Sequence, residues 1–203
     1  MVKPPACALI LLAAGAATRM GRPKQLLAVQ GQPLLRYLVE KNLTAPVTPI
    51  IVILGAQAAV IRPCLDGLPV EIVEHAGWAE GMGSSLRTGI AALAACSPAS
   101  TGVIIALADE PNLSADHITA LIETHRRTGQ PIVASAYGTI RRPPVFFAKK
   151  YFAALAALQG EAGASQLLRD YAPEVATVAL TVVHDLDAPA DYADYLKAHP
   201  PSA

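Results

Sequence analysis

LLAAGAATRMGRPKQLL, from Leu11 to Leu27, begins inside an apolar run and continues into a loop that carries glycine and two cations, Arg19 and Lys24. Backbone N–H groups in such a loop can donate hydrogen bonds to an anion. A guanidinium binds phosphate oxygens through a fork of two hydrogen bonds, and an ammonium binds them as a point charge. We therefore expect an anion here, with a nucleoside triphosphate as the first candidate. A plain strand-to-helix turn with surface cations is the alternative.

Apolar runs alternate with helical patterns along the rest of the chain. Strands are predicted at residues 8–14, 49–54, 69–74, 102–108, 131–136, 145–147 and 175–183. Helices are predicted at residues 33–43, 56–65, 84–95, 114–127, 148–158, 163–171 and 189–198. The strand at 145–147 is expected to be a short edge strand, and Ser84 and Ser114 are expected to be helix N-caps.

Strands that alternate with helices favour an α/β fold, namely a Rossmann-like three-layer α/β/α architecture with a mainly parallel sheet. Because no linker or repeat divides the sequence, residues 1–203 are expected to form a single domain. The hydrophobic fraction of 53% supports a large core.

The charge balance and the cysteines exclude several classes of function. The formal net charge is zero, so neither nucleic acid nor a membrane surface is an expected partner. Cys7, Cys64 and Cys96 lie far apart, which predicts neither a zinc site nor a disulfide framework and fits a reducing cytoplasm. The apolar run near the N-terminus is shorter than the roughly 18 residues that a membrane span needs, and it is not interpreted as a signal peptide.

Two acidic turns follow predicted strands. In ALADEP, Ala106–Pro111, Asp109 comes at the end of a buried strand, where a carboxylate oxygen suits Mg²⁺ beside a triphosphate. In VHDLDAPADY, Val183–Tyr192, Asp185 and Asp187 are two residues apart and share one face of an extended chain. We expect Asp109 and Asp187 to hold Mg²⁺, with Asp185 as the next candidate. An ordinary strand end and a solvated turn that caps the last helix are the alternatives.

A second glycine-containing segment is WAEGMGSSL, Trp78–Leu86. Gly81 and Gly83 would allow the backbone to approach a base or a ribose. Ser84 and Ser85 would add hydroxyl groups. A flexible turn that leads into a capped helix explains the same residues without a ligand.

These segments together resemble one family. LAAGAATRMGRPKQLL is similar to the signature of the molybdenum cofactor nucleotidyltransferases, which is LAAG, a short variable stretch, RMG and then a lysine. RMGRPKQLL is typical of the CTP:molybdopterin cytidylyltransferase branch. The segments WAEGMGSSL, ALADEP and VHDLDAPADY resemble three further motifs of the family in the same order, so the resemblance runs from Leu11 to Tyr195.

The resemblance implies a nucleotidyltransferase-type fold, a reaction and a set of site residues. The reaction is transfer of CMP from CTP to the phosphate of molybdopterin or the molybdenum cofactor, with Mg²⁺ and with release of pyrophosphate; a molybdenum hydroxylase would be the client. Ala13–Ala14 in place of a Gly-Gly start favours CTP over GTP. The expected catalytic residues are Arg19, Lys24 and Asp109. The expected nucleotide-binding residues are Leu12, Ala13, Ala14, Gly15, Arg19, Met20, Gly21, Lys24, Gly81, Gly83, Ser84 and Ser85.

The chain departs from the family pattern where the acceptor should bind. Glu110 stands where the family usually has glutamine, Arg142 where it has glycine and Ser165 where it has arginine. Arg141 and Arg142 could receive an anionic pterin phosphate, or they could be surface cations on a loop.

Three alternatives to this interpretation remain open. The first is the same chemistry with another phosphorylated acceptor or with GTP. The second is a non-catalytic protein that binds or inserts the molybdenum cofactor. The third, an NAD-dependent oxidoreductase, is disfavoured because the spacing of the glycines is not that of the dinucleotide-binding fingerprint.

Overall fold

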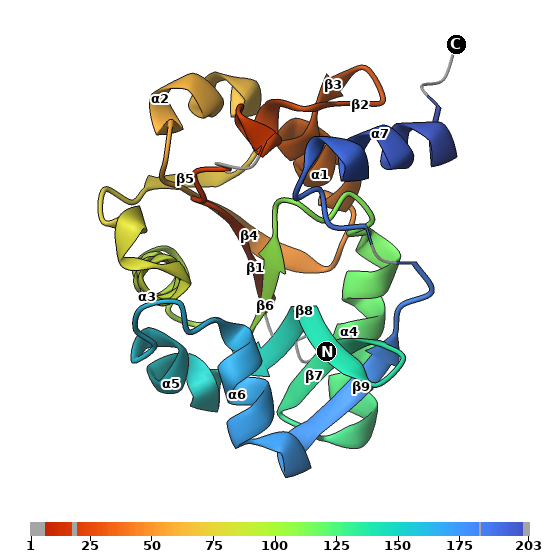
Figure 1. Ribbon diagram of the computed structural model, residues 1–203. Coiled ribbons are helices and arrows are strands. Elements are labelled where there is room, and N and C mark those ends of the chain that lie inside the picture. Colours follow the sequence, from red (N-terminus) through yellow and green to blue (C-terminus); the bar gives the residue numbers. More distant parts are fainter. Residues whose placement is uncertain (1–6, 18–19, 183, 201–203) are drawn as a thin grey trace.

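The computed structural model describes residues 7–17, 20–182 and 184–200. The strands of its main sheet are β1 (Cys7–Ala13), β4 (Val47–Leu54), β5 (Glu71–Glu74), β6 (Gly102–Leu107), β7 (Ile132–Tyr137), β8 (Ile140–Ala148) and β9 (Val175–Ala179). Their order across the sheet is β5-β4-β1-β6-β8-β7-β9 (Figure 1). Strand β8 runs antiparallel to both neighbours, whereas the other neighbouring pairs are parallel. The predicted α/β fold with a mainly parallel sheet is confirmed.

Helices cover both faces of this sheet (Figure 1). The α-helices are α1 (Leu34–Asn42), α2 (Ala58–Ile61), α3 (Met82–Cys96), α4 (Ala115–Thr128), α5 (Phe152–Ala156), α6 (Ala164–Asp170) and α7 (Pro189–Ala198). The 3₁₀ helices are η2 (Lys24–Leu26), η3 (Arg62–Leu65), η4 (Trp78–Glu80), η5 (Lys149–Tyr151) and η6 (Ala172–Glu174), and a small second sheet pairs β2 (Ala28–Val29) with β3 (Gln32–Pro33). Among the described residues, no helix combines the length and the apolar character needed to cross a membrane.

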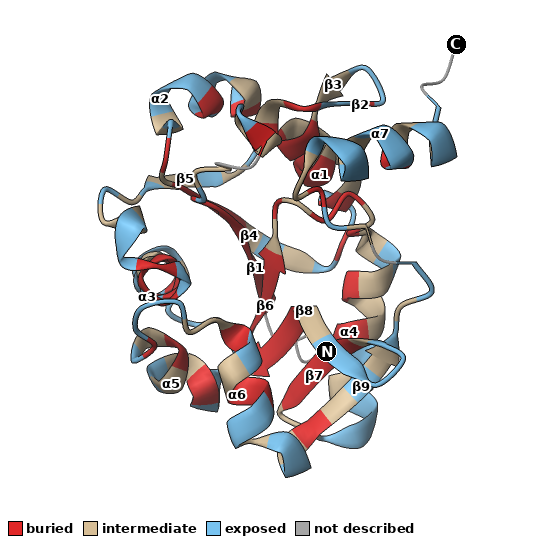
Figure 2. Cartoon of the chain, in the orientation of Figure 1, coloured by how far each residue is buried: buried red, intermediate tan, exposed pale blue. Residues whose placement is uncertain are grey.

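Strand β1 separates two hydrophobic clusters. Leu9 and Leu11 belong to the cluster that includes buried residues of α1, α4 and α7, and Ile10 and Leu12 belong to the cluster of α3, α5 and α6. All residues of β1 are buried (Figure 2). A strand that is covered on both faces needs apolar residues at every position, which explains the unbroken apolar run that precedes the loop.

The side of β1 on which the following strands are added to the sheet changes between β5 and β6. The chain passes from β1 through β4 to β5 on one side, and β6 then lies on the other side of β1. The backbone N–H of Ala108 donates to the carbonyl oxygen of Leu12 over 3.0 Å, so the loops that follow β1 and β6 start side by side. In open α/β sheets such a switch point at the carboxyl ends of the strands is where ligands bind.

Strand β8 differs from its prediction, because residues 145–147 are part of a longer strand in the middle of the sheet. Pro143 and Pro144 interrupt the strand pattern in the sequence, since proline lacks the N–H that a central strand normally donates. The structure accommodates them in two ways: β8 pairs with β6 only over 145–148, and its register with β7 shifts between Ala134 and Ser135. The prolines therefore occupy an irregularity of the ladder.

The start of α3 also differs from its prediction, whereas the start of α4 is confirmed. Helix α3 begins at Met82 with Gly81 as its N-cap, and Ser84 lies within its first turn. The N–H of Gly83 donates to the carbonyl oxygen of Gly160 over 2.9 Å, so a neighbouring loop satisfies a backbone donor of the first turn. In α4, the hydroxyl of Ser114 accepts from the N–H of His117, as an N-cap does.

His117 gives the fold a dependence on pH. Its Nε2 donates to Ser135 Oγ over 2.7 Å, and that hydroxyl donates to the carbonyl oxygen of Pro144 over 2.6 Å. Burial lowers the pKa of His117, so the folded state favours the neutral ring. The unfolded chain then binds a proton more readily, and stability contributed by this residue is lost as the pH falls through the ordinary histidine pKa of about 6.5.

We expect His117→Gln to reduce the loss of stability on acidification, because an amide can still donate to Ser135 but does not titrate. The free energy of unfolding, measured by urea denaturation at about pH 7.5 and about pH 5.5, should fall less in the variant than in the parent protein. Equal losses in both proteins would remove His117 from the pH response.

Candidate active site

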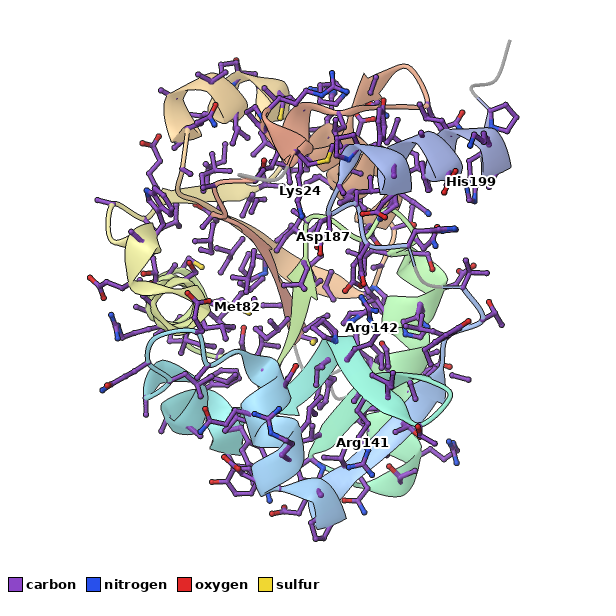
Figure 3. The ribbon with its side chains drawn as sticks, viewed as in Figure 1. Lys24, Met82, Arg141, Arg142, Asp187 and His199 are labelled. Carbon is purple, nitrogen blue, oxygen red and sulfur yellow. The ribbon has the colours of Figure 1, made fainter. Side chains whose placement is uncertain are left out.

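Lys24 joins the two acidic turns. Its Nζ donates to Asp109 Oδ2 over 3.2 Å and also contacts Asp187 Oδ1 (Figure 3). Lys24 comes from the loop after β1, Asp109 from the loop after β6, and Asp187 from the segment before α7. Three stretches that are far apart in the sequence therefore place charged groups at the switch point of the sheet.

Burial shapes the charge of Asp109. Its removal from water raises the pKa of the carboxyl, and the positive charge and hydrogen bond of Lys24 oppose that shift. The negative charges of Asp187 and Asp185 raise the pKa further. An additional cation at this point would favour the ionised carboxylate.

A pocket of about 180 Å³ lies over this charged group. Its lining consists of Leu12, Ala13, Gly15, Ala17, Lys24, Gln25, Ala108, Asp109 and Asp187. Gln25 is buried there, and its Nε2 donates to the carbonyl oxygen of Ala13 over 2.7 Å. This bond fixes the end of β1 against the loop that carries Lys24.

A larger pocket of about 330 Å³ adjoins the first and shares Leu12, Gly15 and Asp109 with it. The residues that only the larger pocket has are Ala14, Ala16, Trp78, Ala79, Gly81, Met82, Ser85, Leu107 and Glu161. Figure 3 labels Met82, from the start of α3, below and to the left of Lys24 and Asp187. A mostly apolar pocket next to a charged one matches the two parts of a nucleotide, the nucleoside and the phosphates.

Gly81 lines the larger pocket, whereas the predicted site residue Gly83 is not among the residues that line either pocket, and both glycines serve a packing function. A Cβ on Gly81 would lie 2.4 Å from the backbone of Gly160, and one on Gly83 would lie 2.8 Å from the backbone of Gln159. Gly81 also has a φ of +103°, which residues with a side chain rarely adopt. Both glycines thus allow the start of α3 to pack against the loop at 158–161, and that loop brings Glu161 to the larger pocket.

Gly81→Ala is therefore expected to lower the free energy of unfolding by roughly 3 kcal/mol, through steric overlap and an unfavourable φ. Gly138→Ala is the matched control, because Gly138 also has a positive φ, +58°, but has open space where the Cβ would go. The control should cost about 1 kcal/mol. Urea denaturation of both variants measures the difference, and equal losses would contradict the packing role.

A second ion cluster lies beside the first. Arg142, on β8, donates to Glu110 Oε1 over 2.9 Å and also contacts Asp185 Oδ1. Burial raises the pKa of Glu110 to about 7 against the opposing effect of Arg142. For Arg142, burial alone would lower the pKa, but the hydrogen bonds to Asp185 and Glu110 outweigh it and raise the pKa. Glu110 and Arg142, two of the departures from the family pattern, are therefore partners.

Several predicted site residues lie outside the two pockets or outside the part of the chain that the structure describes. Arg19 lies outside the described residues. Met20 is buried in the hydrophobic cluster of α1 and α4 and so contributes to the core. The Ser84 hydroxyl is buried, donates to the carbonyl oxygen of Gly81 over 2.7 Å and pairs with His75 Nε2 over 2.8 Å. Gly21 is exposed with a φ of +65°, which fits a turn between Met20 and Lys24.

Several residues in or next to the pockets were not predicted from the sequence. Gln25 gave no signal, because a single polar residue before two leucines is unremarkable in a loop. Trp78, the first residue of WAEGMGSSL, was given no role at the site, and it lines the larger pocket. Gly55 was not considered, although a Cβ there would lie 2.6 Å from both the carbonyl oxygen of Ala14 and the Trp78 Cβ. The sequence signal for Gly55 was its position directly after a strand that ends next to the loop.

The carboxylates fit a divalent metal ion. Because Asp109 and Asp187 contact the same ammonium group, their oxygens face a common point that a cation can occupy. Mg²⁺ and Mn²⁺ prefer oxygen ligands, and Mg²⁺ is usually held by one or two carboxylates together with substrate phosphates. Within the part of the chain that the structure describes, no group of three or more His, Cys, Asp or Glu side chains has a metal-binding arrangement. Phosphate and water oxygens would therefore supply the remaining ligands.

Comparison with known proteins agrees with this geometry. Residues 9–175 match the MobA-like NTP transferase domain family. Nicotine blue oxidoreductase from Paenarthrobacter nicotinovorans is 35% identical over 137 residues, which are 67% of this chain and 64% of that protein, so the chain spans slightly less than two thirds of this relative. Purine catabolism protein PucB from Bacillus subtilis (strain 168) is 26% identical over 169 residues, which are 79% of each protein.

A solved structure extends the similarity to three dimensions. The crystal structure of Rv0371c in complex with manganese, from Mycobacterium tuberculosis H37Rv, is 26% identical, has a TM-score of 0.79 and covers 95% of this chain and 99% of that one. The family match includes the loop with Lys24, the larger pocket and Asp109, and it ends at the start of β9. The chain therefore belongs to the MobA-like NTP transferase domain family, and its domain is of the nucleotidyltransferase type.

Proposed function

We propose that this protein is a Mg²⁺-dependent nucleotidyltransferase that transfers CMP from CTP to the phosphate of molybdopterin or the molybdenum cofactor. The observation that carries the proposal is the contact of Lys24 with both Asp109 and Asp187 beside a pocket of nucleoside size. The manganese complex of the related Rv0371c supports the use of a divalent metal ion.

The proposed reaction is an in-line displacement at the α-phosphorus of CTP. An oxygen of the acceptor phosphate forms a new P–O bond, and the bond to the bridging oxygen of the β-phosphate breaks, so that the electron pair leaves with pyrophosphate. The acceptor phosphate is already ionised at neutral pH, so the reaction requires no general base. The protein has to position the two substrates and stabilise the developing charge.

Each group of the site has a role in this proposal. Lys24 and Arg19 offset the negative charge of the β- and γ-phosphates. Asp109 and Asp187 hold Mg²⁺, which when bound supplies further positive charge at the phosphates. The nucleoside occupies the larger pocket, where Gly15 allows the chain to approach it. Ala13, Ala14 and the RMGRPKQLL segment support CTP as the nucleotide, through the resemblance to the cytidylyltransferase branch.

The cellular setting is part of the same proposal. The described cysteines, Cys7, Cys64 and Cys96, are all free thiols, which fits a reducing cytoplasm. A molybdenum hydroxylase would receive the product. Residues 1–203 would act as one domain, since the loops that carry Lys24, Asp109 and Asp187 surround one sheet with a hydrophobic cluster on each face.

Pyrophosphate release tests the proposal. The protein is incubated with Mg²⁺ and each of CTP, GTP, ATP and UTP, and each mixture contains molybdopterin, a sugar or polyol phosphate, or no acceptor. Release only with CTP and molybdopterin together is the expected result. Release with GTP would contradict the base preference, and release only with a sugar or polyol phosphate would contradict the acceptor. Release under none of these conditions, from folded protein, would favour a non-catalytic protein that binds the cofactor.

An oxidoreductase is the second candidate, because one relative at 35% identity is named nicotine blue oxidoreductase. The paired carboxylates at the switch point argue for a triphosphate with its metal ion, since a nicotinamide dinucleotide site needs no metal-binding carboxylates. Titration with NADH and NADPH, followed by the quenching of Trp78 fluorescence, separates the candidates. Saturable binding of either dinucleotide in place of CTP would support the oxidoreductase.

A further inference from the structure

Two loops supply the carboxylates of the proposed metal site. Asp109 lies in the loop between β6 and α4, and Asp187 lies in the segment between β9 and α7. One backbone hydrogen bond joins the loops directly, from the N–H of Leu186 to the carbonyl oxygen of Asp109 over 3.1 Å. The side chain of Leu186 is fully buried and anchors the second loop in the core.

Arg142 spans the same two loops from a third element. One terminal nitrogen, Nη2, donates to Glu110 in the first loop and contacts Asp185 in the second. Glu110 is the neighbour of Asp109, and Asp185 is two residues before Asp187. Arg142 is on β8, where it pairs with Ser135 of β7, so the guanidinium extends from a strand of the main sheet.

The Glu110 end of the bridge is largely dry, whereas the Asp185 side chain is 42% exposed. The side chain of Glu110 is 9% exposed and that of Arg142 is 20% exposed. Removal of the guanidinium would leave the buried Glu110 carboxyl group without its hydrogen-bond donor, which favours a rearrangement of the loop. Such a rearrangement would move the adjacent Asp109.

The same contacts argue against a direct role of Arg142 on the acceptor. Two carboxylates already compensate its charge, and a phosphate would have to displace one of them. Arg141 is on the opposite face of β8, as adjacent residues of a strand are, and its Nη1 donates to the carbonyl oxygen of Ala172. Figure 3 labels Arg142 nearer than Arg141 to Lys24 and Asp187.

We propose that Arg142 is a positioning residue that holds the two loops together, so that Asp109 and Asp187 are set for a divalent metal ion before the nucleotide binds. The inference rests on the proposed metal-dependent function, but metal binding without nucleotide tests it separately. The pairing also accounts for two departures from the family pattern at once, because an arginine in place of glycine needs a carboxylate in place of glutamine.

Mn²⁺ is the probe, and its free concentration is followed by electron paramagnetic resonance in the absence of nucleotide. Arg142→Ala should weaken Mn²⁺ binding by about 10- to 100-fold, as loss of a group that orients metal ligands does. Arg142→Lys should recover part of the affinity, since an ammonium can pair with one carboxylate. Arg141→Ala is the matched control on the neighbouring position of β8, and it should bind Mn²⁺ like the parent protein.

Electrostatic attraction alone predicts the opposite change in Mn²⁺ affinity for Arg142→Ala, because removal of a cation from an acidic region should tighten the binding of another cation. The double variant Glu110→Gln with Arg142→Gln removes one charge of each sign and leaves no buried carboxylate unpaired at Glu110. It therefore separates the two effects, and it also replaces Arg142→Ala if that variant does not fold. We expect weaker Mn²⁺ binding in the double variant as well.

Catalytic measurements give a second readout. Arg142→Ala should raise the Mg²⁺ concentration needed for half-maximal activity and leave the KM for molybdopterin unchanged. Unchanged or tighter Mn²⁺ binding in Arg142→Ala and in the double variant would overturn the inference, as would a raised KM for molybdopterin alone. If the parent protein binds no Mn²⁺, the inference fails together with the metal site. If it binds Mn²⁺ but releases no pyrophosphate, the proposed function fails and the Mn²⁺ titrations still decide the role of Arg142.

Discussion

Asp109→Asn is expected to lower the rate of pyrophosphate release with CTP and molybdopterin by about 10³-fold, with little change in the fold. An amide keeps the shape of the carboxyl group but has no negative charge to bind a metal ion. The positive charge that the metal ion would place at the phosphates is therefore lost. The fold should persist because Lys24 keeps its contact with Asp187, and the backbone carbonyl of Asp109 still accepts from Leu186. The rate at saturating CTP and the thermal unfolding temperature are the two measurements.

The matched control is Asp194→Asn, on the exposed side of α7, where the carboxylate pairs with Lys197. This variant makes the same chemical change away from both pockets and should keep the parent rate. A rate within about tenfold of the parent rate would contradict this prediction. Loss of one preorganised charged group at a reacting centre should slow the reaction more than that, so Asp109 would then not hold the metal ion.

Lys24→Met is the second change with a large expected effect. The side chain keeps its length and loses the ammonium, so the phosphates lose one cation and the two carboxylates lose their shared partner. We expect kcat/KM for CTP to fall by about 10²- to 10³-fold. Without divalent metal, the free energy of unfolding should fall by about 1–2 kcal/mol, because Asp109 is left largely buried without its donor.

The stability loss offers a further check on this prediction. Mg²⁺ or Mn²⁺ should raise the unfolding temperature of Lys24→Met more than that of the parent protein, since the added cation then replaces the missing one between Asp109 and Asp187. Lys150→Met is the control, because Lys150 pairs with Glu174 on the surface. An unchanged kcat/KM for CTP in Lys24→Met would remove Lys24 from the phosphate site.

The regular part of the fold could be predicted from the sequence because it follows local rules. Strand β1 is apolar throughout since helices cover it on both faces, and α4 begins where Ser114 caps it. The place of Asp109 also followed from a general rule, as ligands gather at the carboxyl ends of parallel strands, whereas Asp187 lies beyond an edge strand, β9, that ends at Ala179 and not at the predicted residue 183. These inferences needed only periodicity, capping residues and the order of strands and helices.

The rest depended on contacts between distant residues. Strand β8 was misjudged because its two prolines break the local pattern, although β6 and β7 pair with it on either side. The pairing of Glu110 with Arg142 joins positions 32 residues apart and needed the true place of β8. The start of α3 at Met82 depended on the loop at 158–161, which no sequence signal near Ser84 indicated.

Label transfer from CTP to the pterin tests the central claim most directly. The protein, Mg²⁺ and molybdopterin are incubated with CTP labelled with ³²P at either the α- or the γ-phosphate, and the pterin product is isolated. We expect the α-label in the pterin product and the γ-label in pyrophosphate, and we expect Asp109→Asn to slow both by about 10³-fold. Transfer of the γ-label to the pterin, or no transfer of either label by folded protein, would contradict nucleotidyl transfer at this site.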